Sequence, residues 1–434
     1  MKFIIIIIIV KVLIAIVPFI AIVYNSTKVK EWLISLYGLK NILSSPRELG
    51  LLLVLFLMEF TRGAFFLTFL PLYAVNYLSL SVAAAGFAVS AHYLTETVFK
   101  GAAGWQLDHR GQSILPGGLI TGLVALLMMK LYPSVPVLTI GAAIFGLGVS
   151  PVWLAVISEV APVQLKERAA RMGVIFSIWL AGSGSGPVAI NFLIARDYNL
   201  AFWLMIALWG CALLTALALP PRAKDNYSSG GGGFSFRKEV VRIVQNQAVK
   251  KILLPGMFLQ TMTGGIILPL LPVYVQNQIG LNPQQYALLL LVGGGAAALS
   301  FLPMGRLAER LRLKYLLCAG FGMSALSLAI FTIAREALSA YLLAALVGFS
   351  YAMVLPAWNN LLAKAIPPER QATGWGVFST IEGMGIAVGP TIGGLVAKHL
   401  GISYAILFCT SLLAAMSCFY FLYPVEKIFH KQAV

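Results

Sequence analysis

Apolar runs of about 20 residues recur along almost the whole chain, and they restrict its possible folds more than any other feature. A run of this length is what an α-helix needs to cross roughly 30 Å of hydrocarbon. With 59% hydrophobic and 11% charged residues and a mean hydropathy of +0.89, the chain is far more apolar than soluble domains are. The sequence therefore predicts an all-α integral membrane protein.

Twelve membrane spans are expected, six on each side of a polar central segment. We place them at about 49–76, 82–103, 112–131, 136–160, 172–194, 199–219, 252–278, 284–304, 314–333, 338–362, 374–397 and 402–423. The expected organisation is an N-lobe (49–219), a Gly/Ser-rich linker (220–251), a C-lobe (252–423) and a tail (424–434). Residues 1–48 predict an additional hydrophobic helix and an amphipathic segment, with a cleaved signal peptide as the alternative.

The distribution of Lys and Arg predicts the orientation in the membrane. The formal net charge is +16, and about 23 basic residues fall on the side of the linker and tail, against about 4 on the opposite side. Since basic loops stay in the cytoplasm, we expect the linker and C-terminus to be cytoplasmic and the protein to be multi-pass in the cell membrane. The basic loops favour membrane lipids, rather than nucleic acid, as partners.

The two halves of the chain repeat each other. At an offset of 201 residues, FLPLYAVNYLSLS aligns with LLPVYVQNQIGLN, and GWQLDHRG aligns with GRLAERLR. At an offset of 203, GVIFSIWLAGSGSGP aligns with GVFSTIEGMGIAVGP. A six-helix unit used twice in parallel resembles the major facilitator superfamily of secondary transporters. This resemblance implies a fold of two six-helix bundles, here with an additional N-terminal hydrophobic helix.

Two short motifs extend the resemblance. Gly104, Asp108 and Gly111 fit the superfamily's loop after the second helix, although the basic residues that normally follow are missing. The antiporter pattern of the fifth helix is complete in the C-half, at Gly376, Gly385, Gly389, Pro390, Gly393 and Gly394. Glycines in this pattern allow close helix approach, and packing alone is as good an interpretation of them as a role in transport.

Charged residues interrupt the first two expected spans. Glu59 and Arg62 lie one turn apart near the middle of the first span, and His92, Glu96 and Lys100 form one stripe along the second. Because a charge at the bilayer centre costs on the order of 3 kcal/mol, these groups should face a cavity or each other.

These charges have two interpretations. The structural one is a pair of salt bridges, Glu59 with Arg62 and Glu96 with Lys100. The functional one is a proton and substrate site controlled by Arg62, in which a buried carboxylate takes up a proton on one side of the membrane and releases it on the other. We expect Glu96 to be the better proton carrier, because Glu59 has a guanidinium on its own helix face. His92 is expected to be a hydrogen-bonded helix residue more often than a relay.

The C-half is apolar where the N-half is charged. Gln260 and Thr263 stand in the places of Glu59 and Arg62, and Glu382 is the one carboxylate well inside a C-half span. A cavity that is polar on one lobe and apolar on the other would suit an amphiphile. Trp153 and Trp179 lie in helix interiors, where an indole face could pack on a sugar ring, although core packing is equally consistent with them.

The segments LFLMEFTRG, SAHYLTE, LGVSPVWL, FSIWLAG, VLPAWNNLLAKAI and GWGVFSTIEGMGIAVGPTIGGL together resemble the lipoteichoic-acid glycolipid flippases of Gram-positive bacteria. The resemblance covers residues 50 to 423. It implies proton-driven movement of a diglucosyl-diacylglycerol anchor to the outer leaflet, with a sugar pocket formed by Glu59, Arg62, Trp153 and Trp179. Glu96 replaces an Asp of that family and Glu382 replaces a Gln. We add His92 and Glu382 to the candidate substrate-binding residues.

The expected function is therefore a proton-coupled antiporter that flips a glycolipid, works as a monomer and needs no cofactor or metal. A multidrug efflux antiporter is the alternative, because the same fold and the same glycine pattern serve that function. An enzyme acting on lipids is disfavoured, since no nucleotide-binding loop and no His-x4-Asp pattern occurs in the sequence.

Overall fold

Twelve membrane-length helical units form the part of the chain that the computed structural model describes, residues 45–110, 114–161, 168–220, 249–365 and 371–423. The predicted N-terminal helix, most of the linker and the tail lie outside these residues. In the first half the units are α3–η1–α4–η2 (Pro46–Tyr77), α5 (Val82–Arg110), α6 (Ile114–Leu131), α7 (Val135–Val160), α8 (Arg168–Ile194) and α9 (Tyr198–Leu217). In the second they are η4–α11–η5 (Val249–Ile279), α12 (Pro283–Arg310), α13 (Leu313–Phe331), α14 (Ala337–Ala365), α15 (Gln371–Leu400) and α16 (Ile402–Leu422).

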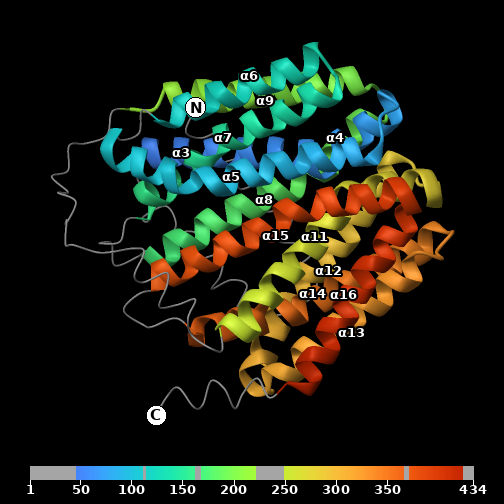
Figure 1. Ribbon diagram of the computed structural model, residues 1–434. Helices are drawn as coiled ribbons and strands as arrows, with labels where there is room; N and C mark the ends of the chain where they lie inside the picture. Colours follow the sequence, from blue (N-terminus) through green and yellow to red (C-terminus); the bar gives the residue numbers. More distant parts are fainter. Residues whose placement is uncertain (1–44, 111–113, 162–167, 221–248, 366–370, 424–434) are drawn as a thin grey trace, which may run out of the picture.

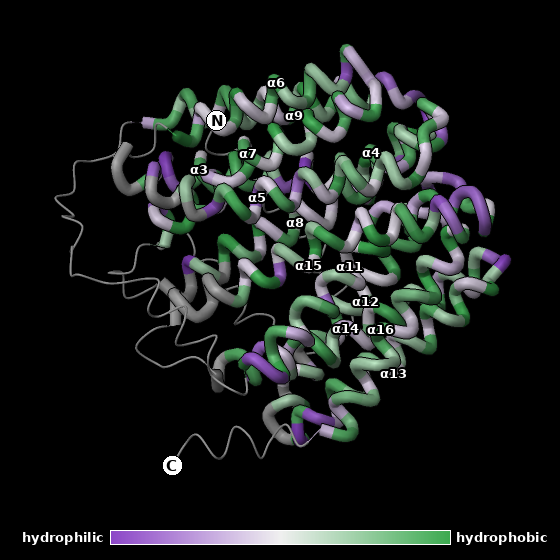
Figure 2. Tube along the Cα trace, viewed as in Figure 1, coloured by the Kyte–Doolittle hydropathy of each residue, from purple (hydrophilic) through white to green (hydrophobic). Residues whose placement is uncertain are grey.

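Each unit corresponds to one of the twelve expected spans, so the prediction of an all-α membrane fold is confirmed. Eleven of the units are long and apolar enough to cross a membrane by hydropathy. The twelfth is α5, whose middle carries polar and charged residues, among them His92, Glu96 and Lys100. Figure 2 shows hydrophobic residues along the shafts of the helices and hydrophilic residues gathered at their ends, as a bilayer requires.

The first helix of each lobe ends in a π-helical turn. In the N-lobe this turn is η2 (Tyr73–Tyr77), and in the C-lobe it is η5 (Val275–Ile279). The turn η2 begins two residues after Pro71 and η5 begins three residues after Pro272, and these two prolines are paired by the sequence repeat. The internal repeat seen in the sequence is therefore reproduced in the backbone geometry.

Glycines bring the helices of each lobe into close contact. A Cβ at Gly186 of α8 would lie 2.2 Å from the carbonyl oxygen of Phe60, and one at Gly389 of α15 would lie 2.4 Å from that of Met262. Only glycine fits at such distances, so α8 packs on α3 and α15 packs on α11 with their backbones almost touching. The expected close approach at the glycine motif is confirmed at Gly385 and Gly389.

The two lobes form two adjacent bundles, coloured blue to green and yellow to red in Figure 1. The main contact between them runs along α5 and α15, with a second between α8 and α12. Ser90 Oγ accepts a hydrogen bond from the Thr391 backbone N–H at 2.9 Å, and the Asn76 side-chain amide donates to Gln276 Oε1 at 3.1 Å. Both bonds lie away from the linker, so the lobes are joined at the end opposite to it.

Candidate functional site

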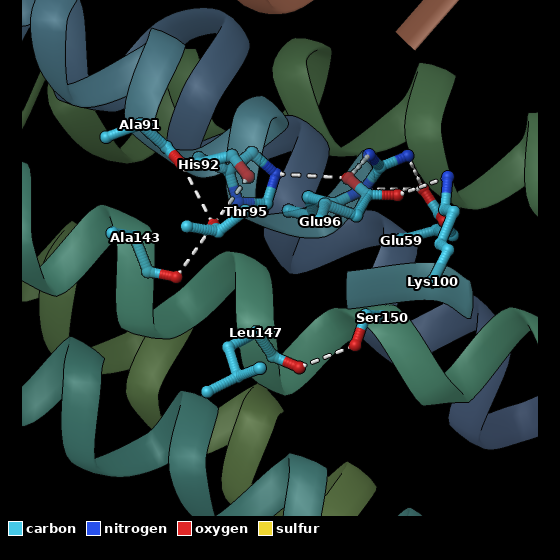
Figure 3. A network of polar contacts seen from close by, with 10 residues as sticks. Glu59, Ala91, His92, Thr95, Glu96, Lys100, Ala143, Leu147 and Ser150 are labelled. Atoms are coloured by element: carbon cyan, nitrogen blue, oxygen red, sulfur yellow. Dashed lines mark hydrogen bonds and ion pairs between the residues drawn. The ribbon is translucent and has the colours of Figure 1, made fainter. Parts of the chain in front are cut away.

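Four charged side chains from two helices form one network in the N-lobe, shown in Figure 3. Glu59, Glu96 and Lys100 are labelled there. Arg62 of α3 donates from Nε and Nη2 to Glu59 Oε2, at 3.1 and 2.7 Å. Its Nη1 donates to Glu96 Oε2 on α5 at 3.1 Å. Lys100 Nζ lies 2.9 Å from Glu96 Oε1. We call Glu59, Arg62, Glu96 and Lys100 the charge cluster.

The charge cluster lies deep in the lobe. Glu59 is 3% exposed and Glu96 is 7% exposed, whereas the Lys100 side chain is 45% exposed. Two carboxylates and two cations give a neutral set, which is how buried charges are tolerated in a membrane interior. Glu59 also lies near the middle of the 32-residue unit Pro46–Tyr77, as expected from the sequence.

Both salt bridges expected from the sequence are present, but Arg62 adds a third that the sequence did not indicate. The preference for Glu96 as proton carrier assumed that the guanidinium served Glu59 alone. That assumption is wrong, because Arg62 bonds to both carboxylates.

The two carboxylates differ in how their oxygens are used. Both oxygens of Glu96 contact a cation: Oε1 contacts the ammonium of Lys100, and Oε2 contacts the guanidinium of Arg62. Both bonds from Arg62 to Glu59 end on Oε2, so Glu59 Oε1 accepts no hydrogen bond from a residue in the described part of the chain. Within the described residues, Glu59 Oε1 is therefore the one carboxylate oxygen of the cluster that no cation contacts.

His92 packs next to the charge cluster, between Glu96 and the ring of Phe66. Its ring is 0% exposed and stacks on Phe66, with centroids 3.9 Å apart and planes 9° apart. Nε2 lies 3.6 Å from Glu96 Oε2, and neither ring nitrogen has a hydrogen-bond partner among the described residues. The ring is thus fully enclosed in this conformation, and its assignment as a substrate-binding residue stays a prediction.

Tight contacts with α7 and α8 fix the position of the charge cluster. Thr95 Oγ1 lies 2.8 Å from the Ala143 carbonyl oxygen, which joins α5 to α7 one residue before Glu96 (Figure 3). On the other side, a Cβ at Gly182 of α8 would lie 3.0 Å from Glu59 Cβ. These contacts fix the backbones of α3 and α5 and so hold the two carboxylates in position for Arg62 and Lys100.

Trp153 of α7 and Trp179 of α8 lie against each other. Their ring centroids are 6.4 Å apart with planes at 66°, an edge-to-face arrangement, and Phe176 lies 5.5 Å from Trp153. Both indoles are half-buried. Trp179 lies one turn along α8 from Gly182, the residue that packs against Glu59. The helix α8 therefore contacts the charge cluster and also carries one ring of the aromatic pair.

Glu382 lies outside the charge cluster, half-buried on α15 of the C-lobe. It forms no hydrogen bond or ion pair with any residue in the described ranges. Its neighbour Gly383 packs on α5, where an added Cβ would lie 2.5 Å from Thr97 Oγ1. The structure thus places Glu382 beside the lobe interface and not with Glu59 or Arg62.

The remaining motif residues are described only in part. Gly104 and Asp108 belong to α5 and Gly376 to α15, without description of their side chains, and Gly111 lies outside the described residues. The Pro390 carbonyl oxygen faces Gly86 of α5, where a Cβ would lie 2.3 Å away, so the end of the glycine motif also packs between the lobes.

Sequence reasoning missed several neighbours of the site. The Tyr93 ring lies 6.0 Å from Arg62 Cζ in a cation–π contact, and Phe66 covers His92. At the linker side of the N-lobe, Arg171 bonds to Glu48 at 2.5 Å and Arg47 bonds to Glu159. No periodicity in the sequence indicates these pairs, because each joins residues more than 100 positions apart.

A cavity of about 400 Å³ lies between α5, α6 and α7, lined by Phe99, Ala103, Gly118 and Ser150 among others. None of the four charge-cluster residues lines it. The candidate site is therefore defined by its charges and aromatic rings, and not by this cavity.

Two curated relatives of similar length match nearly the whole chain. The "Proton-coupled antiporter flippase LtaA" of Staphylococcus haemolyticus is 28% identical over 390 residues, covering 87% of this chain and 94% of the relative. The protein of the same name from Staphylococcus aureus is 26% identical over 393 residues, covering 88% and 96%.

Solved structures show the same fold at lower identity. A bacterial homologue of the human lysosomal transporter Spinster, in an inward-facing and occupied conformation, superposes with a TM-score of 0.73 at 16% identity, covering 89% of this chain and 98% of that one. The nucleoside transporter NupG superposes with a TM-score of 0.68 at 14% identity, covering 89% and 99%.

The family model for the Major Facilitator Superfamily matches residues 51–254 and again residues 253–433. The two matches correspond to the two six-helix halves that the repeat and the structure both define. Proteins of this family are transporters and not enzymes. This chain belongs to the Major Facilitator Superfamily.

Proposed function

We propose that this transporter is a proton-coupled antiporter that flips a glycolipid, the diglucosyl-diacylglycerol anchor of lipoteichoic acid, from the inner to the outer leaflet. Two things support the proposal: the name carried by its staphylococcal relatives, and a site whose chemistry suits a sugar headgroup and a proton. Protons and the glycolipid are the proposed partners, and the cell membrane is the proposed location.

The observation that carries the proposal is the oxygen of Glu59, Oε1, that accepts no hydrogen bond from a described residue. A carboxylate oxygen accepts a hydrogen bond from a sugar hydroxyl, and the same oxygen is where a proton would bind. The two ligands therefore exclude each other at Glu59 Oε1, while Arg62 holds Oε2 in either case. Mutual exclusion at one atom is what exchange of lipid for proton needs.

The rest of the site supports this exchange. Glu96 keeps both oxygens on cations, so it anchors Arg62 and leaves the exchange to Glu59. The aromatic pair Trp153–Trp179 offers an indole face to a sugar ring, whose C–H face packs well on aromatic surfaces. We expect the acyl chains to lie along the apolar C-lobe. The lobes would rock about the site between leaflet-facing states.

The test is flipping of a fluorescent diglucosyl-diacylglycerol by purified protein in liposomes, with and without an imposed pH gradient. Wild-type protein should flip the lipid faster under the gradient, and Glu59→Gln should lose that response. As a control, Glu336→Gln removes an exposed carboxylate outside the site and should behave as wild type. If the protein leaves the lipid unflipped but moves a cationic dye, the glycolipid proposal is wrong and a multidrug antiporter takes its place.

A further inference from the structure

We infer that Lys100 changes partner during transport: it pairs with Glu96 in the conformation described here and with Glu382 of the C-lobe when the lobes close on the linker side. This deepens the proposed alternating transport, but it does not depend on the identity of the cargo. The inference assigns a role to Glu382, the one carboxylate well inside an expected C-lobe span, which is not part of the charge cluster.

The register between α5 and α15 places the two residues near each other. The helices run antiparallel, with Ala83 against Gly394 and Ser90 against Thr391. Thr97 lies against Gly383 further along. Toward the linker, residue numbers therefore rise along α5 and fall along α15. Lys100 comes one turn after Thr97, and Glu382 directly precedes Gly383.

The two side chains are suited to such a contact. Lys100 Nζ is bonded to Glu96, yet its side chain is 45% exposed, the most of any charge in the cluster. Its flexible four-carbon stem lets the ammonium move without a change in the backbone. Glu382 is half-buried and has no ion pair with a described residue. The phenol of Tyr351 on α14 is near enough to interact with it, but it supplies no positive charge. A carboxylate without a cation in this position is costly, and this cost favours a conformation that supplies one.

The conformation itself indicates when the exchange occurs. Here the lobes are joined at the end away from the linker, through Asn76 and Ser90. Alternating access rocks the lobes about the central site, so this end opens as the linker side closes. The contact of Thr97 with Gly383 lies between these ends. The halves of α5 and α15 beyond it then approach each other, and Lys100 moves toward Glu382.

The pair predicts a specific pattern of variants. Ser90→Cys provides a reporter, because Ser90 is buried between the lobes here and becomes accessible when this end opens. Its labelling by a membrane-impermeant maleimide, above the labelling of protein that retains Ser90, measures the opposite state. Lys100→Met and Glu382→Gln should each reduce labelling by at least about fivefold, the lower end of typical coupling between states.

The double variant decides between a shared pair and two separate effects. If Lys100 and Glu382 act together, the double variant should label no more slowly than the slower single variant. Glu382→Asp should restore part of the labelling, and Glu336→Gln should leave it unchanged. Additive single effects, or an unaffected Glu382→Gln, would overturn the inference. If the pattern holds while wild-type protein flips no glycolipid, the inference stands and only the proposed cargo fails.

Discussion

Arg62 and Glu59 are joined by two hydrogen bonds, yet substituting Glu59 should lower the stability of the protein far less than substituting Arg62. Glu59→Gln keeps an oxygen that accepts from Arg62, and the guanidinium still has Glu96. A neutral bond replaces a charge-assisted one, at a cost of about 1–2 kcal/mol. Arg62→Met instead leaves Glu59 buried with no cation, and breaking a buried pair in this way costs about 3–5 kcal/mol.

The double variant tests this reasoning. Glu59→Gln combined with Arg62→Met removes the uncompensated carboxylate, while Glu96 keeps Lys100. It should therefore be more stable than Arg62→Met alone, although it carries one more substitution. Thermal melting of the four proteins in detergent gives the order directly. If the double variant melts at or below the temperature of Arg62→Met, the stability of this region does not come from charge pairing.

Three further outcomes are expected. Gly186→Ala should lower the melting temperature, at about 1–3 kcal/mol for overpacking against Phe60, while Gly184→Ala should not, because nothing lies within 4 Å of its added Cβ. Trp179→Leu should reduce glycolipid flipping by about tenfold without changing dye transport, because about 1.4 kcal/mol of stacking on the sugar is lost. Equal losses for both cargoes would show that Trp179 serves only in helix packing. His92→Phe should keep both melting temperature and gradient response, since the stack on Phe66 remains, and loss of the response alone would assign Nε2 a proton relay.

The number and position of the helices could be predicted because hydrocarbon imposes one length on every span. The repeat around Pro71 and Pro272 then divided them into two lobes. Most ends agree within a few residues, and the larger differences are at α5 and α12, which continue to Arg110 and Arg310. There the chain keeps its helical hydrogen bonds after its apolar run has ended.

The site was only partly predictable. Glu59 with Arg62 and Glu96 with Lys100 follow from helical spacing, so both pairs could be expected. The bond from Arg62 to Glu96 could not, because it depends on the distance and rotation between α3 and α5. Packing of this kind is set by contacts such as that of Thr95 with Ala143, which no local pattern reveals. The same holds for the ring of Phe66 over His92.

The neutrality of the charge cluster has a consequence for how transport is powered. One bound proton gives the set of Glu59, Arg62, Glu96 and Lys100 a net charge of +1, whereas an uncharged sugar headgroup leaves it at zero. In the proposed cycle only the proton-loaded half carries charge across the membrane field. Each elementary charge moved through 100 mV is worth about 2.3 kcal/mol. A voltage that is negative inside would therefore drive lipid export even where the pH is equal on both sides.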